Sequence, residues 1–286
     1  MLNDIGVVHL IRSQNGIEQF KIFLNSYINN TGGLRHELIL IFKGFSSEIE
    51  AAEYKALLTN LNYFSIFIED RGFDIGSYFN AANVFKYEYY CFLNSSSILL
   101  DKEWLVKMYQ YISQDNIGLV GATASYESPY YNFLNIHRFT SSNAPLYRRV
   151  IRDSYFNRLR YSYYYPPFPN YHIRTNAFMI KNEILNRIKH KNMRSKIDTL
   201  RFENGRFSLT MQILKMKLDA LVVGKDGKAY KKEDWRKSNT FRQNNQENLL
   251  ISDNQTDRYL KANSDEKMYL SKLAWGDVPS RRECNT

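Results

Sequence analysis

The feature that most constrains the fold is an alternation of short apolar runs with helical patterns along the first 120 or so residues. Each apolar run is rich in β-branched or aromatic residues and ends in polar ones, which is typical of a β-strand. After the first run, apolar side chains recur at Ile17, Phe20 and Leu24, the spacing of one helix face. Strands that alternate with helices predict a mostly parallel sheet covered on both faces. The five predicted strands cover residues 7–11, 38–42, 63–68, 89–93 and 117–120.

The alternation stops between residues 125 and 176 and then resumes. Residues 161–169 combine aromatic side chains with three prolines, so we expect an ordered loop or lid there. Two further strands are predicted at 177–180 and 220–223, with helices near 183–190 and 205–217. The pattern as a whole indicates a Rossmann-like α/β fold.

Length and composition favour one large folded domain with an appendage. The chain has 286 residues, of which 44% are hydrophobic and 24% charged, the profile of a globular protein. We expect a domain over residues 1–238, with a first half at 1–124 and a second half at 125–238. Residues 239–286 form a polar extension whose apolar side chains, Leu249 and Trp275 among them, predict that it packs onto the domain.

The lack of a recognisable targeting signal and the small number of cysteines predict an intracellular protein. No apolar run approaches the roughly 18 residues that span a bilayer, and the first twelve residues lack the pattern of a signal peptide. We therefore expect a cytoplasmic protein, with a peripheral position at the membrane left open. Cys91 and Cys284 are too few for a disulfide framework or a zinc cluster and are interpreted as free thiols.

The net charge of +10 indicates an anionic partner. Nucleic acid is the weaker interpretation, because no recognisable nucleic-acid module accompanies the charge and the richest basic stretch, residues 187–196, is interrupted by uncharged residues. A phosphate-bearing small molecule fits the charge better. It would bind at the carboxyl ends of the parallel strands, where the polar clusters fall. The Gly-x-Gly-x-x-Gly fingerprint and the phosphate-binding loop are both absent, which disfavours oxidoreductases and nucleotide hydrolases.

Three segments of the sequence carry a resemblance to a known family. The first is residues 92–96, Phe-Leu-Asn-Ser-Ser, at the end of the fourth predicted strand. They resemble the Phe-Leu-Asp-x-Asp that glycosyltransferases with the A-type fold, close to family 2, have at that place. Residues 72–82 are similar to the glycine-containing turn and helix upstream, and residues 202–206 lie where such enzymes carry their acidic catalytic residue. The resemblance covers about residues 5–223 and implies a nucleotide-sugar donor with a glycan or lipid-linked acceptor. The Asp-x-Asp pair itself is missing.

Sugar transfer needs a cradle for the nucleotide diphosphate and a stabiliser for the leaving group. Asp70 and Asp74 can accept hydrogen bonds from a base or ribose, whereas Lys43, Arg71 and serine hydroxyls can contact phosphate. Asp74 is equally explained as a helix cap, and residues 94–97 as a polar turn. The candidate donor-binding residues are Ser13, Lys43, Asp70, Arg71, Asp74, Asn94, Ser95 and Ser96.

The resemblance implies that Glu203, rather than Asp198, is the general base of an inverting transfer. A structural role as an acid in the first turn of a helix stays open for Glu203. His172, Arg174 and Asn176 follow the aromatic stretch and are candidates for the acceptor side. That stretch either stacks on sugar rings, packs in the core, or contacts a lipid-linked acceptor.

No metal cofactor is expected, because Asn94 and Ser96 replace the acidic ligands of the family. Mg²⁺ or Mn²⁺ would need carboxylates from elsewhere, such as Asp70, Asp74 or Asp101. The diphosphate would otherwise be stabilised by basic groups, with Arg174 or Lys225 approaching from the later segment.

Three other functions remain open at this stage. The missing acidic pair allows a domain that binds a saccharide or nucleotide without turnover. A nucleotidyltransferase shares the α/β layout, although residues 12–16 offer only one glycine and one basic residue. A nucleic-acid-binding protein is suggested only by the charge.

Overall fold

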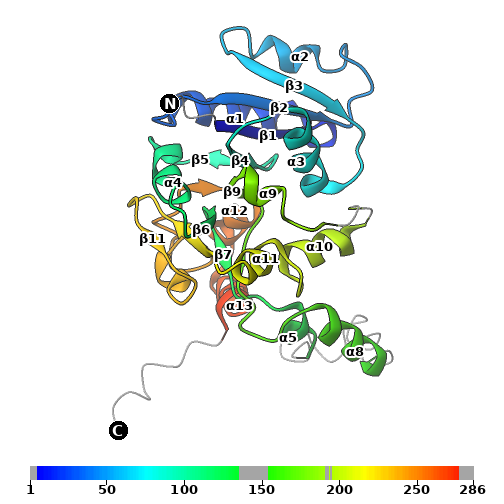
Figure 1. Ribbon diagram of the computed structural model, residues 1–286, viewed down its shortest axis with the longest axis vertical. Helices are drawn as coiled ribbons and strands as arrows, with labels where there is room; N and C mark the ends of the chain where they lie inside the picture. The colour runs from blue at the N-terminus through cyan, green and yellow to red at the C-terminus, as the bar shows by residue number, and fades with distance from the viewer. Residues whose placement is uncertain (1–4, 135–153, 191–192, 194, 277–286) are drawn as a thin grey trace.

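A computed structural model describes residues 5–134, 154–190, 193 and 195–276, and its centre is an eight-stranded sheet (Figure 1). All seven strands predicted from the sequence belong to this sheet. Their order is β11 (Ala229–Tyr230), β10 (Asp219–Val223), β6 (Ile117–Gly121), β9 (Ala177–Lys181), β4 (Tyr89–Leu93), β1 (Ile5–Arg12), β2 (Glu37–Lys43) and β3 (Tyr63–Ile68).

The sheet is mostly parallel, as predicted. Strands β3, β2, β1 and β4 run in one direction, and β10 runs parallel to β6. Strand β9 is antiparallel to both β4 and β6, and β11 is antiparallel to β10. The carboxyl ends of β1, β2, β3 and β4 therefore meet at one edge.

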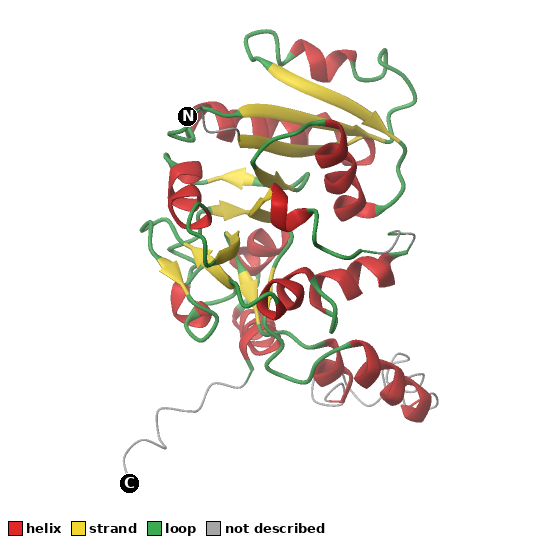
Figure 2. Cartoon of the chain, in the orientation of Figure 1, coloured by secondary structure: helices red, strands yellow, loops and turns green. Residues whose placement is uncertain are grey.

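Helices cover both faces of the sheet, which confirms the α/β prediction (Figure 2). Strand β1 is apolar on both faces of the sheet. Val7 and Ile11 join the core on one face, and Val8 and Leu10 join the core on the other. The first core includes α1 (Gly16–Asn29), α2 (Ala52–Ala56) and α4 (Trp104–Ile112). The second includes α3 (Phe73–Val84), α9 (Asn182–Leu185), α10 (Lys196–Asn204) and α11 (Leu209–Lys215).

The C-terminal segment contacts the rest of the chain at several points. Strand β12 (Ile251–Ser252) pairs with β5 (Ile98–Leu99), and α12 (Asn254–Lys261) and α13 (Ser264–Trp275) follow it. The indole of Trp275 is buried and donates to the carbonyl of Phe241 at 2.8 Å. The domain limits at residues 124 and 238 stay predictions.

Two helices in the structure were not predicted from the sequence. Helix α8 (Ser154–Tyr164) includes the first four residues of the stretch predicted to be a loop, and it lies beside α5 (Pro129–Leu134). Helix α10 precedes the predicted helix near 205–217, which is observed as α11. The short strands β7 (Ala124–Ser125) and β8 (His172–Ile173) and the 3-10 turns η1 (Ser13–Asn15) and η2 (Trp235–Ser238) complete the elements.

Within the described part of the chain, we find no helix that is both long and apolar enough to cross a membrane. Cys91 is a buried free thiol in β4, as predicted, and burial raises its pKa. Cys284 lies outside the described residues.

His9 is a titratable side chain in the middle of the core. Its ring is 1% exposed and stacks on Phe23, with ring centroids 3.4 Å apart. Its Nδ1 atom is buried without a hydrogen-bond partner. Burial lowers the pKa of His9 to about 3, so the ring is neutral in the folded protein.

Replacing His9 with Phe should reduce the acid sensitivity of the fold. An unfolded histidine has a pKa near 6.5, so below this pH the unfolded chain binds a proton that the folded chain does not. The free energy of unfolding therefore falls as the pH falls, and His9 accounts for about 2 kcal/mol of that loss between pH 7 and pH 5. Urea unfolding at both pH values measures the effect. Equal pH dependence in wild type and His9→Phe would contradict the prediction.

Candidate functional site

A cavity of about 940 Å³ lies at the carboxyl ends of β1, β2 and β3 and the start of α3. This is the edge at which α/β proteins bind ligands. Four of the predicted donor-binding residues, Lys43, Asp70, Arg71 and Asp74, line it together. The other lining residues are Arg12, Gly72, Phe73, Gly76, Phe79, Asn80, Asn83, His190 and Met193.

A bidentate ion pair joins the ends of β1 and β3 at the cavity wall. The Arg12 guanidinium donates from Nε to Asp70 Oδ1 at 3.0 Å and from Nη2 to Asp70 Oδ2 at 2.8 Å. Arg12 holds the pKa of Asp70 below its usual value, so this carboxylate is ionised. The sequence analysis missed Arg12 as a site residue, although its position at the end of the first strand was the available signal.

Lys43 connects β2 to the helix that borders the cavity. Its ammonium is buried, donates to the carbonyl of Phe73 at 2.6 Å and lies 4.0 Å from Asp70 Oδ1. Burial lowers the pKa of Lys43, whereas the carboxylates of Asp74 and Asp70 act against that shift.

Asp74 is not the cap of α3. The N-cap is Gly72, which has φ 77° and makes no side-chain cap. Burial raises the pKa of Asp74, and its carboxylate accepts no hydrogen bond from any described residue. The helix-cap interpretation of this residue was therefore wrong. The carboxylate is left as an acceptor at the cavity.

An aromatic pair forms part of the cavity wall. The rings of Phe79 and His190 stack with centroids 3.8 Å apart and planes at 22°. The side chains of Asn80 and Asn83 also line the cavity, which adds amide donors and acceptors to an apolar surface.

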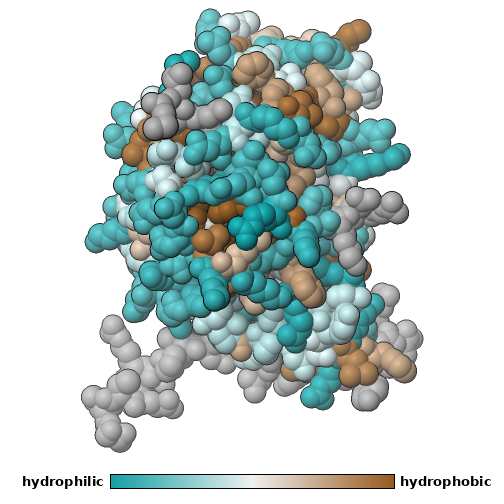
Figure 3. Space-filling view, viewed as in Figure 1, coloured by the Kyte–Doolittle hydropathy of each residue, from teal (hydrophilic) through white to brown (hydrophobic). Residues whose placement is uncertain are grey.

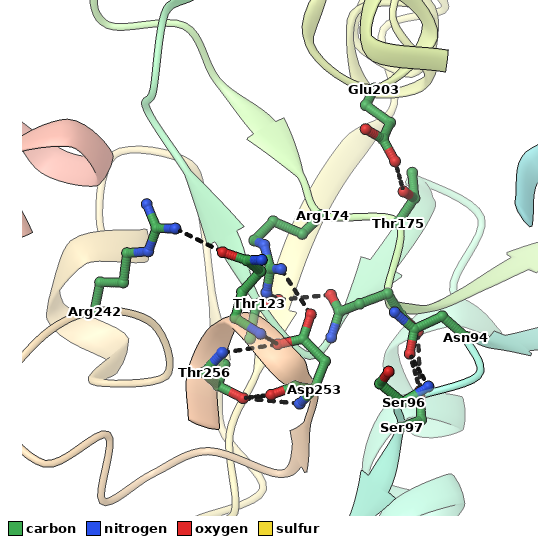
Figure 4. Close-up of polar contacts among 12 residues, drawn as sticks. Asn94, Ser96, Ser97, Thr123, Arg174, Thr175, Glu203, Arg242, Asp253 and Thr256 are labelled. Atoms are coloured by element: carbon green, nitrogen blue, oxygen red, sulfur yellow. Dashed lines mark hydrogen bonds and ion pairs between the residues drawn. The ribbon is translucent and has the colours of Figure 1, made fainter. Parts of the chain in front are cut away.

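The polar residues after β4 form a turn outside the cavity lining. Asn94 Oδ1 accepts from the backbone N–H of Ser96 at 3.1 Å and from Ser97 Oγ at 3.0 Å (Figure 4). Ser95 Oγ accepts from the amide of Asn15 at 2.7 Å. Ser13, in the same 3-10 turn as Asn15, is partly exposed. These contacts are those of a polar turn, which was the structural alternative for this segment.

Hydrogen bonds link this turn to two of the predicted acceptor residues. The carbonyl of Asn176 accepts from the backbone N–H of Asn94 at 2.9 Å, and Asn176 Oδ1 accepts from Thr123 Oγ1 at 2.9 Å. Arg174 donates to Thr123 Oγ1 at 3.3 Å and to Asp253 Oδ2 at 2.6 Å (Figure 4). The end of β4, the start of β9 and the C-terminal segment thus meet in one polar cluster.

Asp253 was not predicted from the sequence. Its carboxylate is 1% exposed, and it also caps α12 by accepting from the backbone N–H groups of Gln255 and Thr256. A second arginine, Arg242, donates to Gln255 and pairs with Glu127 at 3.4 Å. The guanidinium carbons of Arg174 and Arg242 lie 4.2 and 4.8 Å from the centroid of the Phe241 ring.

His172 lies in the interior, close enough to Arg174 and Arg242 to respond to their charges. Its ring is buried, with Nδ1 2.9 Å from the carbonyl oxygen of Asn170. Burial lowers the pKa of His172 to about 4, so the ring is neutral at physiological pH.

Glu203 lies in the last turn of α10, so the first-turn interpretation was wrong. Its Oε1 accepts from the hydroxyl of Thr175 at 2.5 Å (Figure 4). Burial raises the pKa of Glu203, and the negative charge of Asp74 acts in the same direction. Asp198, the other acid considered, is the N3 residue of a capping box with Ser195 at the start of α10.

The donor set after β4 does not fit a hard divalent cation. Asn94 Oδ1 is engaged by two donors within its own turn, and Ser96 offers only a hydroxyl. Asp70 is paired with Arg12, and Asp101 is paired with Lys107 at 2.5 Å. In the part of the chain that the structure describes, no group of three or more His, Cys, Asp or Glu side chains is placed to hold a metal ion.

Comparisons with known proteins gave structural likenesses only. No family model and no curated protein sequence matches the chain. The mannosyltransferase PcManGT from Pyrobaculum calidifontis, solved with GDP-Man and Mn²⁺, has a TM-score of 0.49 at 12% identity over 94% of this chain and 69% of that one. Mouse xyloside xylosyltransferase 1 has a TM-score of 0.42 at 12% identity over 77% and 85%. Residues 1–349 of S. aureus TarS have a TM-score of 0.41 at 13% identity over 69% and 53%.

Removing the hydroxyl of Thr175 should raise the pKa of Glu203 further. The Thr175 hydrogen bond lowers this pKa and opposes the effect of burial, so Thr175→Val leaves burial as the larger influence. Carboxyl ¹³C NMR titration of Glu203 measures the shift. Thr199→Val is the control on the same helix, because its hydroxyl faces the carbonyl of Ser195 instead. An unchanged or lower Glu203 pKa in Thr175→Val would contradict the prediction.

Proposed function

We propose that the chain is a glycosyltransferase that transfers a sugar from a nucleotide-diphosphate sugar to a hydroxyl of a glycan or lipid-linked acceptor. The observation that carries the proposal is the cavity at the strand ends. Its wall combines three cations, Arg12, Lys43 and Arg71, with two carboxylates, Asp70 and Asp74. The half-buried carboxylate of Glu203 is close enough to respond to the charge of Asp74. The candidate group for donor recognition, Asp74, therefore lies near the candidate group for proton transfer, Glu203.

The cavity suits the nucleoside end of the donor. Its volume of about 940 Å³ is within the range of small-molecule sites. Asp74 has a free acceptor capacity toward the cavity and would take hydrogen bonds from ribose hydroxyls or base N–H groups. The stacked Phe79 and His190 rings offer an apolar surface for a base.

Fixed positive charge would stabilise the leaving diphosphate. Arg71 lines the cavity and is 86% exposed, and among the described residues it pairs with Glu69, which is similarly exposed. Arg174 is held in one orientation by Asp253 and lies in the cluster that follows β4. Oriented guanidinium groups recognise phosphate oxygens without a metal ion. We therefore propose that donor binding needs little or no divalent cation.

Glu203 is proposed as the general base of an inverting displacement. The acceptor oxygen attacks the anomeric carbon as its proton passes to the Glu203 carboxylate. The bond from that carbon to the diphosphate oxygen breaks, and the diphosphate leaves with the electron pair. A raised pKa suits this role, because a base works best when its pKa approaches the working pH.

One observation favours a second candidate, a domain that binds the donor without turnover. The resemblance places an acidic pair at the end of β4, but the residue there is Asn94, which has an amide instead of a carboxylate. That amide is also engaged by hydrogen bonds within its own turn. Turnover of a nucleotide sugar separates the two candidates. The nucleotidyltransferase alternative is weaker, because Arg12, the basic residue after the first strand, is already paired with Asp70.

Nucleotide sugars should stabilise the folded protein in EDTA. A ligand that binds only the folded state at 100 times its Kd adds about 2.7 kcal/mol to the free energy of unfolding. Thermal-shift and calorimetric titration with UDP-, GDP- and dTDP-sugars would identify the donor. In Asp74→Asn, the loss of a charged acceptor should weaken binding roughly 10- to 100-fold.

The control for this titration is Asp265→Asn, which changes an acidic residue in the first turn of a different helix, α13. It should bind the donor like the wild type. Absence of binding by every donor would overturn the proposed function. Binding that appears only when Mn²⁺ replaces EDTA would overturn the metal-independent part alone.

Glu203→Gln should lower turnover on the order of 10²-fold or more while leaving donor affinity unchanged. The substitution keeps the side-chain shape but removes the proton acceptor. Product formation from the identified donor, measured beside calorimetric affinity, tests the role. Glu183→Gln, an exposed acid on α9, is the control and should be fully active. Near-normal turnover in Glu203→Gln would remove this residue from the mechanism.

A further inference from the structure

Residues 174–176, which connect β8 to β9, join two distant parts of the chain. Arg174 donates from Nη2 to Asp253 Oδ2 in the C-terminal segment at 2.6 Å (Figure 4). The next residue, Thr175, donates to Glu203 Oε1 on α10. Two neighbouring side chains therefore connect the C-terminal segment to the proposed general base.

The C-terminal segment reaches residues 174–176 by a second route. Strand β12 immediately precedes Asp253 and pairs with β5, which immediately follows Ser97. Ser97 Oγ donates to the carbonyl of Asn176 at 3.2 Å. Together with the ion pair between Arg174 and Asp253, these contacts close a ring. Residues 174–176 are thus held at both ends by one segment of the chain.

Asp253 is the fixed partner in its pair with Arg174. As the N-cap of α12 it also accepts from the backbone N–H groups of Gln255 at 3.1 Å and Thr256 at 2.9 Å. Burial acts to raise the pKa of Asp253, but the charge and hydrogen bond of Arg174 outweigh it, so the carboxylate is ionised.

The ion pair also lies beneath the surface. Hydrophilic side chains dominate the face of the molecule in Figure 3, where water competes with polar contacts. The side chains of Arg174 and Asp253 are only 15% and 1% exposed. Breaking such a pair leaves a buried charge without its partner, which is strongly unfavourable.

We propose that Asp253 is a positioning residue for the general base: it fixes residues 174–176 through Arg174, and Thr175 in turn holds the Glu203 carboxylate in place. The inference rests on the proposed function, because it takes Glu203 as the base. A base must meet the acceptor hydroxyl at hydrogen-bond distance, so a small displacement of the carboxylate slows proton transfer. The C-terminal segment is then part of the catalytic apparatus and not only a packed extension.

Carboxyl ¹³C NMR titration of Glu203 in Asp253→Asn tests the proposal without any sugar donor. Asparagine caps helices as well as aspartate does, so the substitution removes the charge that holds Arg174 and leaves α12 capped. If residues 174–176 shift, Glu203 loses the hydrogen bond from Thr175, and its pKa rises as in Thr175→Val. The double variant D253N/T175V should then titrate like Thr175→Val alone.

The direct effect of charge on Glu203 has the opposite sign. Burial, the largest influence, raises the pKa of Glu203, as does Asp74, whereas Arg174 and Lys196 lower it. Removing the negative charge of Asp253 and releasing Arg174 would therefore lower this pKa. A rise reports displacement of the segment, and a fall reports a change of charge alone.

Turnover of the identified donor gives a second measurement. Asp253→Asn should lower kcat on the order of 10-fold, and the limb of the pH–rate profile that reports the base should move to higher pH. Asp257→Asn is the matched control, because it makes the same change on α12 at an exposed side chain that pairs with Lys261. It should leave both kcat and the pKa of Glu203 unchanged.

Asp253→Ser, which also keeps a capping side chain, is the second variant should Asp253→Asn fail to fold. An unchanged or lower Glu203 pKa in the folded variant would overturn the proposal. A rise that adds in full to that of Thr175→Val would do so too, because the effect would not pass through Thr175. Absence of turnover by the wild type with every donor would overturn the proposed function, and the titration would still decide whether Asp253 positions Glu203.

Discussion

The buried ammonium of Lys43 is the interaction on which the cavity depends. A buried charge is costly unless polar groups surround it, and here the carbonyl of Phe73 accepts a hydrogen bond from the ammonium at 2.6 Å while Asp70 Oδ1 lies 4.0 Å away. Phe73 is the first residue of α3, so the same contact fixes the start of that helix against the end of β2. Asp74, the next residue, is thereby held at the cavity. One buried lysine thus positions the carboxylates that a ligand would meet.

The strands could be predicted from the sequence because both faces of the sheet are buried. Most strands are then nearly continuous apolar runs that end where the polar edge of the sheet begins. Helices α8 and α10 were missed for a different reason. In α8 Phe156, Leu159 and Tyr163 are exposed. In α10 only Phe202 and Asn204 are buried, so neither helix shows a continuous inward apolar stripe. What orders them is contact with distant segments, which sequence spacing does not reveal.

The residues of the candidate site also separate into those that could be predicted from the sequence and those that could not. Lys43, Asp70, Arg71 and Asp74 were predictable, because each lies within a few residues of a strand end or a helix start at one edge of the sheet. Asp253 was not predictable. It meets Arg174 across 79 residues of sequence, and it belongs to a segment without the strand and helix alternation. Such a pair follows from the way the C-terminal segment packs, not from any local pattern.

The amide at position 94 is not required by the turn in which it lies. Its Oδ1 atom accepts two hydrogen bonds, from the backbone of Ser96 and the hydroxyl of Ser97, and a carboxylate would accept both equally well. The choice of Asn over Asp therefore changes charge and not local structure. A carboxylate at position 94 would need a cation to balance its charge, whereas the neutral amide does not. Arg174 can therefore stay paired with Asp253. In the proposed reaction, this arrangement places the positive charge for a leaving diphosphate on guanidinium groups that the fold itself orients.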